Sequence, residues 1–253
     1  MFNTPPTQYD VSFSFYGFPV RVHPLFWIVF SLFGVMFHST IDEGNLAFWL
    51  VEIVIWVAAV FVSVLAHELG HALVFRHVFR VPSAITLHGF GGVTVPYYAH
   101  RRKPGFFGLV CEVFLSAAGA LAEFFLAGLL IMLLALMQTA GLAEVMKMGF
   151  FLGALNPTVI LVVFMMKVIF ISIFWGLFNL LPIYPMDGGQ ISREIFSYFS
   201  PRHGVGNSLV LSMVVAILMA IFVVRLAQPF IAILFVYFAY QNYRELSFRS
   251  FRP

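Results

Sequence analysis

The sequence predicts an all-α polytopic membrane protein with about six transmembrane helices and small membrane-associated β-hairpins. Of its 253 residues, 61% are hydrophobic and only 10% are charged, which is too little polar surface to cover a water-soluble globule of this size. Several apolar segments exceed the ~20 residues that a helix needs to cross a bilayer, so helices are indicated rather than a barrel. We therefore expect a single integral membrane domain over residues 1–253, with no appended soluble domain.

The rest of the composition argues against other classes of protein. The single cysteine, Cys111, cannot form an internal disulfide framework. The N-terminus lacks the basic region, short apolar run and small-residue cleavage site of a signal peptide, so no cleaved leader is expected. The net charge of +3 reflects membrane topology better than nucleic-acid binding. The expected partner is membrane lipid, and no nucleic acid.

Two stretches with alternating apolar residues predict the β-hairpins. The first covers residues 9–22 around Gly17, and the second covers residues 83–95 around the glycines at 89–92. Transmembrane spans are expected over residues 25 to about 40, 46–79, 107 to about 137, 157–181, about 207–225 and about 229–240. The second span is longer than one crossing needs, so it tilts, kinks or projects past the bilayer. Residues 182–189 break the chain after the fourth span, and a short amphipathic segment follows.

Basic residues predict the orientation of these spans. With six spans and both ends inside, eleven of the fourteen Lys and Arg fall on the inner side. They are Arg21, Arg76, Arg80, Arg101, Arg102, Lys103, Arg193, Arg202, Arg244, Arg249 and Arg252. Because cytoplasmic loops carry an excess of Lys and Arg, this topology is favoured. We expect an integral protein of the cell (plasma) membrane, with the functional site toward the cytoplasm.

One motif lies inside the second span, His67-Glu68-Leu69-Gly70-His71. Two histidines four residues apart lie on one face of a helix, where both imidazoles can bind one zinc ion, and the glutamate between them can act as general base. The alternative explanation of a bare His-Glu-x-x-His is chance. Chance is disfavoured because the chain has only 8 histidines, and ionisable residues inside an apolar span are functional by default.

Two histidines leave zinc one short of the three protein ligands that catalytic sites usually supply. Asp187 is the best candidate for the third, because it follows a span that ends on the same side of the membrane as His71. A plain Asp-Gly-Gly turn is the alternative. Asn179 carries an uncharged amide suited to donating a hydrogen bond to a developing oxyanion. A structural cap at the end of the fourth span is the other interpretation of Asn179.

These motifs resemble those of the site-2 protease family of intramembrane zinc metalloproteases. That family pairs His-Glu-x-x-His in one span with Asn-x-x-Pro-x-x-x-x-Asp-Gly in a later one, and both are present here at residues 67–71 and 179–188. The likeness extends from Gly17-Phe18-Pro19-Val20-Arg21-Val22-His23-Pro24 through the Gly91-Gly92 hairpin to Gly189. The chain departs from the family at residues 118–123, where Ala-Gly-Ala-Leu-Ala-Glu replaces the frequent Ala-Gly-Pro-x-x-Asn. This change is expected to affect local packing and any role of that asparagine, but not the zinc site.

The resemblance implies a zinc metalloendopeptidase with one Zn²⁺ per chain. In it, His67, His71 and Asp187 hold the metal, Glu68 activates the water, and Asn179 lies beside the substrate carbonyl. Zinc lowers the pKa of a bound water to about 7 and polarises the scissile carbonyl, while the glutamate moves the proton to the leaving amine.

The implied substrates are peptide bonds within or near the cytoplasmic end of transmembrane segments of membrane proteins. A helix hides its peptide bonds, so such a substrate must be unwound first. The second hairpin offers an exposed strand that can pair with the unwound chain. The predicted substrate contacts are Ile85, Leu87, Gly91, Gly92 and Val93. The alternative is a hairpin that only plugs the cytoplasmic mouth of the site.

Other functions are compatible with the same ligands. The first is a metal transporter or non-catalytic zinc-binding membrane protein, but transporters usually have repeated halves and no repeat is visible. An inactive relative acting as chaperone or adaptor would not need intact zinc and base residues. Regulation is expected through a membrane partner, through a first cut that trims the substrate, or not at all. Glu123 and Lys167 lie at similar depth in their spans and are expected to pair, with neutral or water-facing side chains as the alternative.

Overall fold

The computed structural model describes residues 5–37, 46–100, 102–139, 157–226 and 229–250. It divides into two compact units. The first contains Met1–His100 and Gly119–Gly176, and the second contains Arg101–Ala118 and Leu177–Pro253. Because the segments of the two units alternate along the chain, no single cut in the sequence separates them. The expected single domain stays a prediction.

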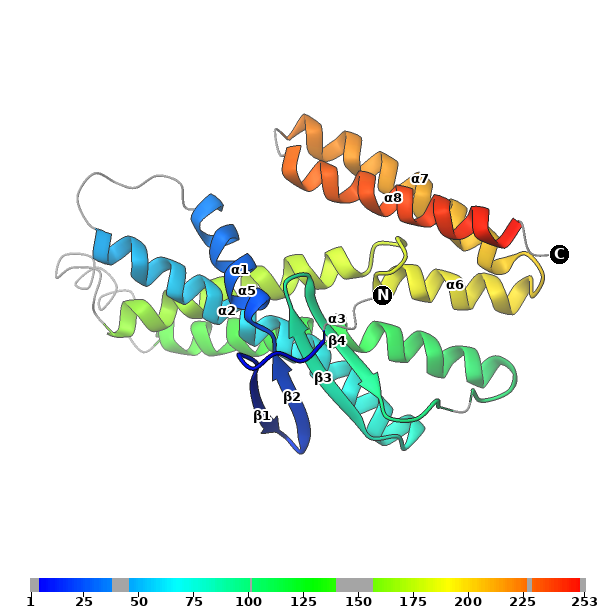
Figure 1. The fold of residues 1–253 in the computed structure, drawn as a ribbon. Coiled ribbons are helices and arrows are strands. Elements are labelled where there is room, and N and C mark those ends of the chain that lie inside the picture. The colour runs from blue at the N-terminus through cyan, green and yellow to red at the C-terminus, as the bar shows by residue number, and fades with distance from the viewer. Residues whose placement is uncertain (1–4, 38–45, 101, 140–156, 227–228, 251–253) are drawn as a thin grey trace. The chain divides into compact units, whose positions relative to one another are not determined.

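A four-stranded sheet organises the first unit (Figure 1). Its strands β1 (Val11–Phe15), β2 (Phe18–Val22), β3 (Ser83–His88) and β4 (Gly91–Pro96) lie in the order β1-β2-β3-β4. Both predicted hairpins are present, because β1 pairs antiparallel with β2 and β3 pairs antiparallel with β4. The sequence did not predict that a parallel pairing of β2 with β3 joins the two hairpins into one sheet.

Local chemistry explains the first hairpin and the helix after it. Tyr16 and Gly17 both have positive φ, 49° and 76°, as the two central residues of a type I′ turn require. Helix α1 (Pro24–Phe37) begins with proline, whose missing N–H costs nothing at the first helical position. Val20 and Val22 of β2 lie opposite Ile85 and Leu87 of β3, and all four side chains are buried. They form one face of the core of this unit.

Helices cover that face of the sheet. Helices α1, α2 (Leu46–Val74) and α5 (Pro157–Asn179) contribute buried side chains to the same core, and partly buried side chains of α3 (Gly105–Thr139) pack against it. Helix α2 continues into a π-helical segment, η1 (Phe75–Phe79), so the predicted long second span is interrupted only near its end. Arg80 closes it with a left-handed backbone, φ 58°. The irregularity expected for this long span is therefore a π turn at its end.

The second unit packs three helices around small side chains. They are α6 (Asp187–Phe199), α7 (Gly204–Arg225) and α8 (Pro229–Ser250), and Figure 1 shows α7 and α8 side by side. Ala216 and Ala220 of α7 are buried against Ala232 and Phe235 of α8. Small residues let two helix backbones approach closely. Such close packing associates helices in a bilayer, where the hydrophobic effect does not drive them together.

Four helices of the described residues are long and apolar enough to cross a membrane. They cover Trp49–Phe79, Gly105–Met137, Pro157–Asn179 and Gly204–Arg225, which correspond to the expected second to fifth spans. The expected first span corresponds to α1, a shorter apolar helix, and the sixth to the beginning of α8, which continues beyond the predicted end at residue 240. The chain is mostly helical with a small sheet, as predicted, but the count of six spans is not confirmed.

Candidate active site

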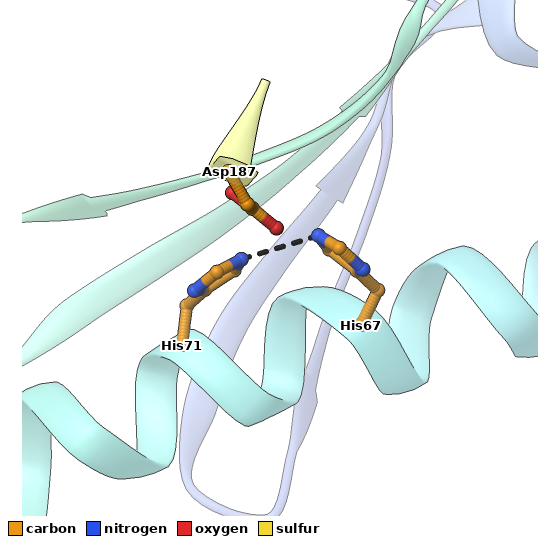
Figure 2. Close-up of side chains that lie close together, drawn as sticks. All are labelled: His67, His71 and Asp187. Carbon is orange, nitrogen blue, oxygen red and sulfur yellow. Dashed lines mark hydrogen bonds between the residues drawn. The ribbon is translucent and has the colours of Figure 1, made fainter. Parts of the chain in front are cut away.

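His67 and His71 lie one helical turn apart on α2, as their spacing predicts. Their Nε2 atoms face each other at 3.1 Å, within hydrogen-bond distance, and their rings are T-shaped at 4.9 Å between centroids (Figure 2). His67 is buried, and His71 is half-buried. Two ligands of a tetrahedral zinc with bonds of ~2.0–2.1 Å lie about 3.4 Å apart. The two imidazoles are therefore close to the spacing that one zinc ion requires.

Gly119 of α3 keeps the space in front of the two imidazoles empty. A Cβ atom at this position would lie 2.5 Å from the Nε2 atom of His67 and 2.5 Å from that of His71. A side chain at this position would have to displace both imidazoles. The glycine thus leaves a cradle, lined by two nitrogen donors, that an ion bound to both imidazoles fits.

Glu123, one turn further along α3, holds the His67 ring. Its Oε2 atom is 2.9 Å from Nδ1 of His67, and its side chain is fully buried. When Nδ1–H donates to this carboxylate, Nε2 keeps its lone pair for a metal. The expectation that the change at residues 118–123 does not affect the zinc site is therefore wrong, because Glu123 contacts a predicted zinc ligand. The available signal in the sequence was an acid inside an apolar span, four residues after Gly119.

Glu68 is buried beneath strand β4. The Thr94 hydroxyl lies 2.7 Å from Oε2 of Glu68 and 2.9 Å from its backbone carbonyl, and so can donate to either oxygen. A Cβ atom at Gly92 would lie 2.4 Å from Cγ of Glu68. The side chain of Glu68 therefore occupies the space that Gly92 leaves, and β4 fixes its position beside the two histidines on α2.

The predicted substrate contacts lie in different environments on the second hairpin. Ile85 and Leu87 are buried in the core, and β3 is an inner strand that is paired on both sides. Strand β4 ends the order of the sheet within the described residues, so it has the edge that another strand can join. Gly91 has φ +117° and packs against Trp175 of α5, and Val93 is half-buried. Any pairing with a substrate strand therefore involves β4 and not β3.

Asp187 is the first residue of α6 in the second unit and is buried. The alternative of a plain Asp-Gly-Gly turn is wrong, because Gly188 and Gly189 continue the helix. A Cβ atom would lie 2.1 Å from the Leu180 carbonyl oxygen at Gly188, and 2.3 Å from the Tyr184 nitrogen at Gly189. The two glycines thus let the start of α6 pack directly against the preceding backbone, which fixes where the aspartate begins.

Two polar side chains from α7 and α8 hold the segment before Asp187. The Tyr184 N–H donates to Ser212 Oγ at 3.0 Å, and Asn242 Nδ2 donates to the Tyr184 carbonyl at 2.6 Å. Both side chains are buried. Asn179, the last residue of α5, lies before this segment and is half-buried. Its predicted contact with a substrate carbonyl stays a prediction.

Lys167 forms an ion pair that differs from the expected one. Its Nζ atom lies 2.8 Å from Oε2 of Glu52 on α2, and both side chains are largely buried. The expected partner Glu123 bonds to His67. The depth of two residues along their spans was therefore insufficient to pair them, because it does not say which way each helix faces.

Two groups outside the spans have shifted pKa values. Burial lowers the pKa of His88 at the end of β3, and electrostatic interactions with His23 and Arg21 lower it further. Hydrogen bonds from Thr7 lower the pKa of Asp10 below its usual range, with Arg21 acting in the same direction. Neither group belongs to the histidine pair, so these shifts concern the sheet and its surroundings.

The fold and the site define a polytopic membrane protein with a His-Glu-x-x-His motif, of the kind that binds zinc, on a helix. Residues 55–221 match peptidase family M50, and the chain belongs to this family. The resemblance to site-2 proteases predicted from the motifs is thereby confirmed.

Named relatives agree with the family. The chain is 30% identical over 233 residues to a zinc metalloprotease of Methanocaldococcus jannaschii, covering 89% of this chain and 58% of that protein. It is also 30% identical over 193 residues to Rip3 of Mycobacterium tuberculosis, likewise named as a zinc metalloprotease, covering 74% of this chain and 43% of that one. The chain thus spans about half the length of these relatives. The solved site-2 protease of M. jannaschii shares its fold, with a TM-score of 0.50, 22% identity and coverage of 94% and 95% of the two chains.

Proposed function

We propose that this chain is an intramembrane zinc metalloendopeptidase. It hydrolyses peptide bonds within or near the cytoplasmic end of transmembrane segments of membrane-protein substrates. The observation that carries the proposal is the pair of Nε2 atoms of His67 and His71, 3.1 Å apart over the space left by Gly119, with the buried Glu68 between them on the same helix. Membership of peptidase family M50 and the names of the relatives support the same activity.

One zinc ion per chain, held by His67, His71 and Asp187, is the proposed cofactor. Figure 2 draws these three side chains, each of which offers one donor atom. Imidazole nitrogens and one carboxylate are a common donor set of catalytic zinc. The bound ion supplies Lewis acidity, which lowers the pKa of water to about 7 and polarises a carbonyl.

The chain's own residues perform the proton transfers. Glu68 accepts a proton from the attacking water and passes it to the leaving amine, which general acid–base catalysis requires. Thr94 donates to the Glu68 carboxylate and orients it, while Glu123 keeps the His67 ring in one tautomer. Asn179 donates a hydrogen bond to the oxyanion that develops on the substrate carbonyl.

The substrate is a transmembrane protein or peptide that binds as an extended strand. The outer edge of β4 is the proposed pairing site, because β4 is the last strand of the sheet and contacts Glu68 through Thr94. Pairing with an exposed strand edge satisfies the backbone N–H and C=O groups that lose their helical hydrogen bonds when the substrate unwinds. Gly91 and Val93 belong to this edge strand, whereas Ile85 and Leu87 support it from the core.

Contacts between distant segments support six membrane crossings. Segments that touch lie on one side of the membrane, so the chain between them crosses an even number of times. Strands β2 and β3 pair with each other, and α1 and α2 lie between them in the chain. Because α2 is long enough to cross the membrane once, α1 supplies the second crossing that returns the chain to the same side. Asn242 donates to the Tyr184 carbonyl, and α7 and the start of α8 lie between these residues in the chain. Because α7 crosses the membrane once, the start of α8 supplies the crossing that returns the chain. Arg102 and Glu194 form a bidentate ion pair, and the spans α3 and α5 lie between them in the chain. Two crossings therefore separate these two residues along the chain.

This topology places the site toward the cytoplasm of the cell membrane. Eleven of the fourteen Lys and Arg then fall on one side, and the positive-inside rule assigns that side to the cytoplasm. The end of α2 that carries His67 and His71 is on this side, next to the sheet. A regulatory membrane partner is proposed as the source of control, with a first cut that trims the substrate as the other route.

A Glu68→Gln variant separates the protease from a zinc-binding protein or metal transporter. Glutamine keeps the size and hydrogen bonding but removes the basic carboxylate, so turnover should fall by a factor of about 10²–10⁴ while zinc is retained. The assay is cleavage of a single-span substrate with helix-weakening Gly or Pro in its cytoplasmic half, with zinc measured by elemental analysis. Cleavage at the wild-type rate would refute the protease mechanism. Zinc flux into vesicles that depends on His67 but not on Glu68 would establish a transporter.

A further inference from the structure

A pocket lies at the end of the sheet opposite the β3–β4 turn. It has a volume of about 330 Å³ and is formed by the β1–β2 turn, the end of η1 and the start of β3. Its lining includes Gly17, Phe18, Arg76, Arg80 and Ser83. None of the described residues that line it is acidic, and none belongs to the zinc motif. The pocket therefore has two positive charges and no described negative charge to balance them.

Arg76 is held in a fixed position in this pocket. Its guanidinium carbon lies 3.5 Å from the centre of the Phe18 ring, which is buried, and its NH1 group donates to the Tyr16 carbonyl at 3.0 Å. A Cβ atom at Gly17 would lie 3.4 Å from NH2 of Arg76, so the glycine lets the guanidinium lie close to the turn. Only one of the five N–H groups is used by the Tyr16 carbonyl, which leaves a planar, oriented set of donors for an anion.

Ser83 adds a buried hydroxyl to the wall of the pocket. Its side chain is 1% exposed, and its Oγ atom has no hydrogen-bond partner among the described residues. A buried polar group without a partner costs about 1–3 kcal/mol relative to a satisfied one. An acceptor oxygen bound in the pocket would satisfy this hydroxyl, so Ser83 indicates a ligand that carries oxygen atoms.

The backbone brings Arg80 to the mouth of the pocket. Arg80 is exposed and has a left-handed backbone at the end of η1, φ 58°, and the Val81 N–H donates to the Phe75 carbonyl. This reversal directs the chain from the membrane helix into β3. The arginines at positions 76 and 80 thus lie close to the reversal, and the exposed side chain of Arg80 can turn toward a ligand in the pocket.

The pocket lies where the apolar span ends. The span Trp49–Phe79 includes Arg76 near its end, and the tyrosines Tyr16 and Tyr97 beside the pocket are 68% and 57% exposed. Tyrosine and arginine are typical of the interface between lipid tails and water. A phosphate-bearing headgroup is the anion most abundant at that depth.

We propose that this pocket binds a phosphate group, supplied by the headgroup of an anionic membrane lipid. Arg76 and Arg80 supply charged donors, Ser83 supplies a hydroxyl, and Phe18 and the tyrosines supply the apolar surroundings. Bound lipid would attach the N-terminal hairpin to the membrane surface. The inference does not depend on proteolysis, because none of these residues takes part in the proposed reaction.

The test measures binding to the purified full-length chain in detergent. The probes are dihexanoyl phosphatidylglycerol, inorganic phosphate and dihexanoylglycerol, which has the same acyl chains without phosphate. The variants are Arg80→Ala and Ser83→Ala, with Arg202→Ala as a control because Arg202 is an exposed arginine outside the pocket. Circular dichroism and size-exclusion chromatography establish that each variant is folded.

Phosphatidylglycerol should bind the wild-type chain and the Arg202→Ala variant equally, and Arg80→Ala about tenfold more weakly, as the loss of a hydrogen bond to a charged group predicts. Ser83→Ala should weaken binding severalfold. Binding of inorganic phosphate that is lost in Arg80→Ala, without binding of phosphatidylglycerol, would overturn the lipid as the source and assign the site to free phosphate. Equal binding by all variants, or equal binding of dihexanoylglycerol, would overturn the proposal. If Arg80→Ala fails to fold, Ser83→Ala alone decides by the same criterion.

Discussion

Replacing Gly119 with alanine should empty the zinc site without unfolding the protein. The added Cβ would lie 2.5 Å from both Nε2 atoms of His67 and His71, whereas a zinc ion binds such atoms at ~2.0–2.1 Å. The methyl group would thus occupy the position of the ion. Because the atoms it meets are at the ends of two side chains, the imidazoles can rotate away. The fold should survive, and the donors should be separated.

The magnitude follows from the same geometry. Altering an outer partner of a zinc ligand typically costs 10–100-fold in metal affinity, so a group that displaces both ligands should cost about 100-fold or more. Gly128→Ala is the matched control, since it lies on the same helix and its Cβ would meet no atom within 4 Å. Both substitutions raise helix propensity by about 1 kcal/mol, so helix stability does not distinguish them.

The assay is zinc content by elemental analysis, together with cleavage of the single-span substrate. The wild type and Gly128→Ala should each contain about one zinc per chain and cleave the substrate. Gly119→Ala should contain none and be inactive. If Gly119→Ala retained a full zinc ion, the space between the two imidazoles would not be the metal position, and the reasoning about the cradle would be wrong.

Glu123→Gln should weaken zinc binding by about 10–100-fold, because the amide is a poorer acceptor for Nδ1–H of His67, and a chelator titration measures the change. The pKa of His88 is lowered in the folded state and its Nδ1 accepts the Phe90 N–H, so the unfolded state binds more protons below about pH 6.5. Thermal stability in detergent should therefore fall as the pH drops through that range, and His88→Gln should flatten the profile; an unchanged slope would count against it. In a Cys111→Ser background, His77→Cys should react with an impermeant thiol reagent only from the cytoplasmic side, and Arg225→Cys only from outside, whereas the reverse would overturn the topology.

The zinc helix could be predicted from the sequence because its information is local. The four-residue spacing of the two histidines fixes their shared face whatever surrounds the helix, and Figure 2 shows that face. The two hairpins were also local, since alternation and Gly17 determine the first of them without distant partners. The role of Gly188 and Gly189 depends on the preceding backbone against which they pack, which the sequence does not show. They lie in a helix and not in the turn that is the alternative interpretation of Asp-Gly-Gly.

What could not be predicted depends on distance along the chain. The parallel pairing of β2 with β3 joins strands about sixty residues apart, and no local pattern in either strand encodes the other. The depth of Glu123 in its span suggests Lys167 as a partner, but the rotation of α3 about its axis directs Glu123 to His67. The partner of Lys167, Glu52, lies on the same helix as the zinc motif, more than a hundred residues away along the chain.

The parallel pairing of β2 with β3 also has a consequence for how the protein is made. Strand β2 is synthesised before α1 and α2, and its partner β3 only after both. The sheet can close only if the insertion machinery has placed the two strands in the same compartment. In the proposed topology, a chain in which α1 failed to insert would leave Val20 and Val22 on one side of the membrane and Ile85 and Leu87 on the other, each pair with its apolar face in water. Such a chain would expose to proteolytic quality control the apolar side chains that the paired sheet buries. Formation of the sheet would therefore depend on correct insertion of the helix that carries the zinc ligands.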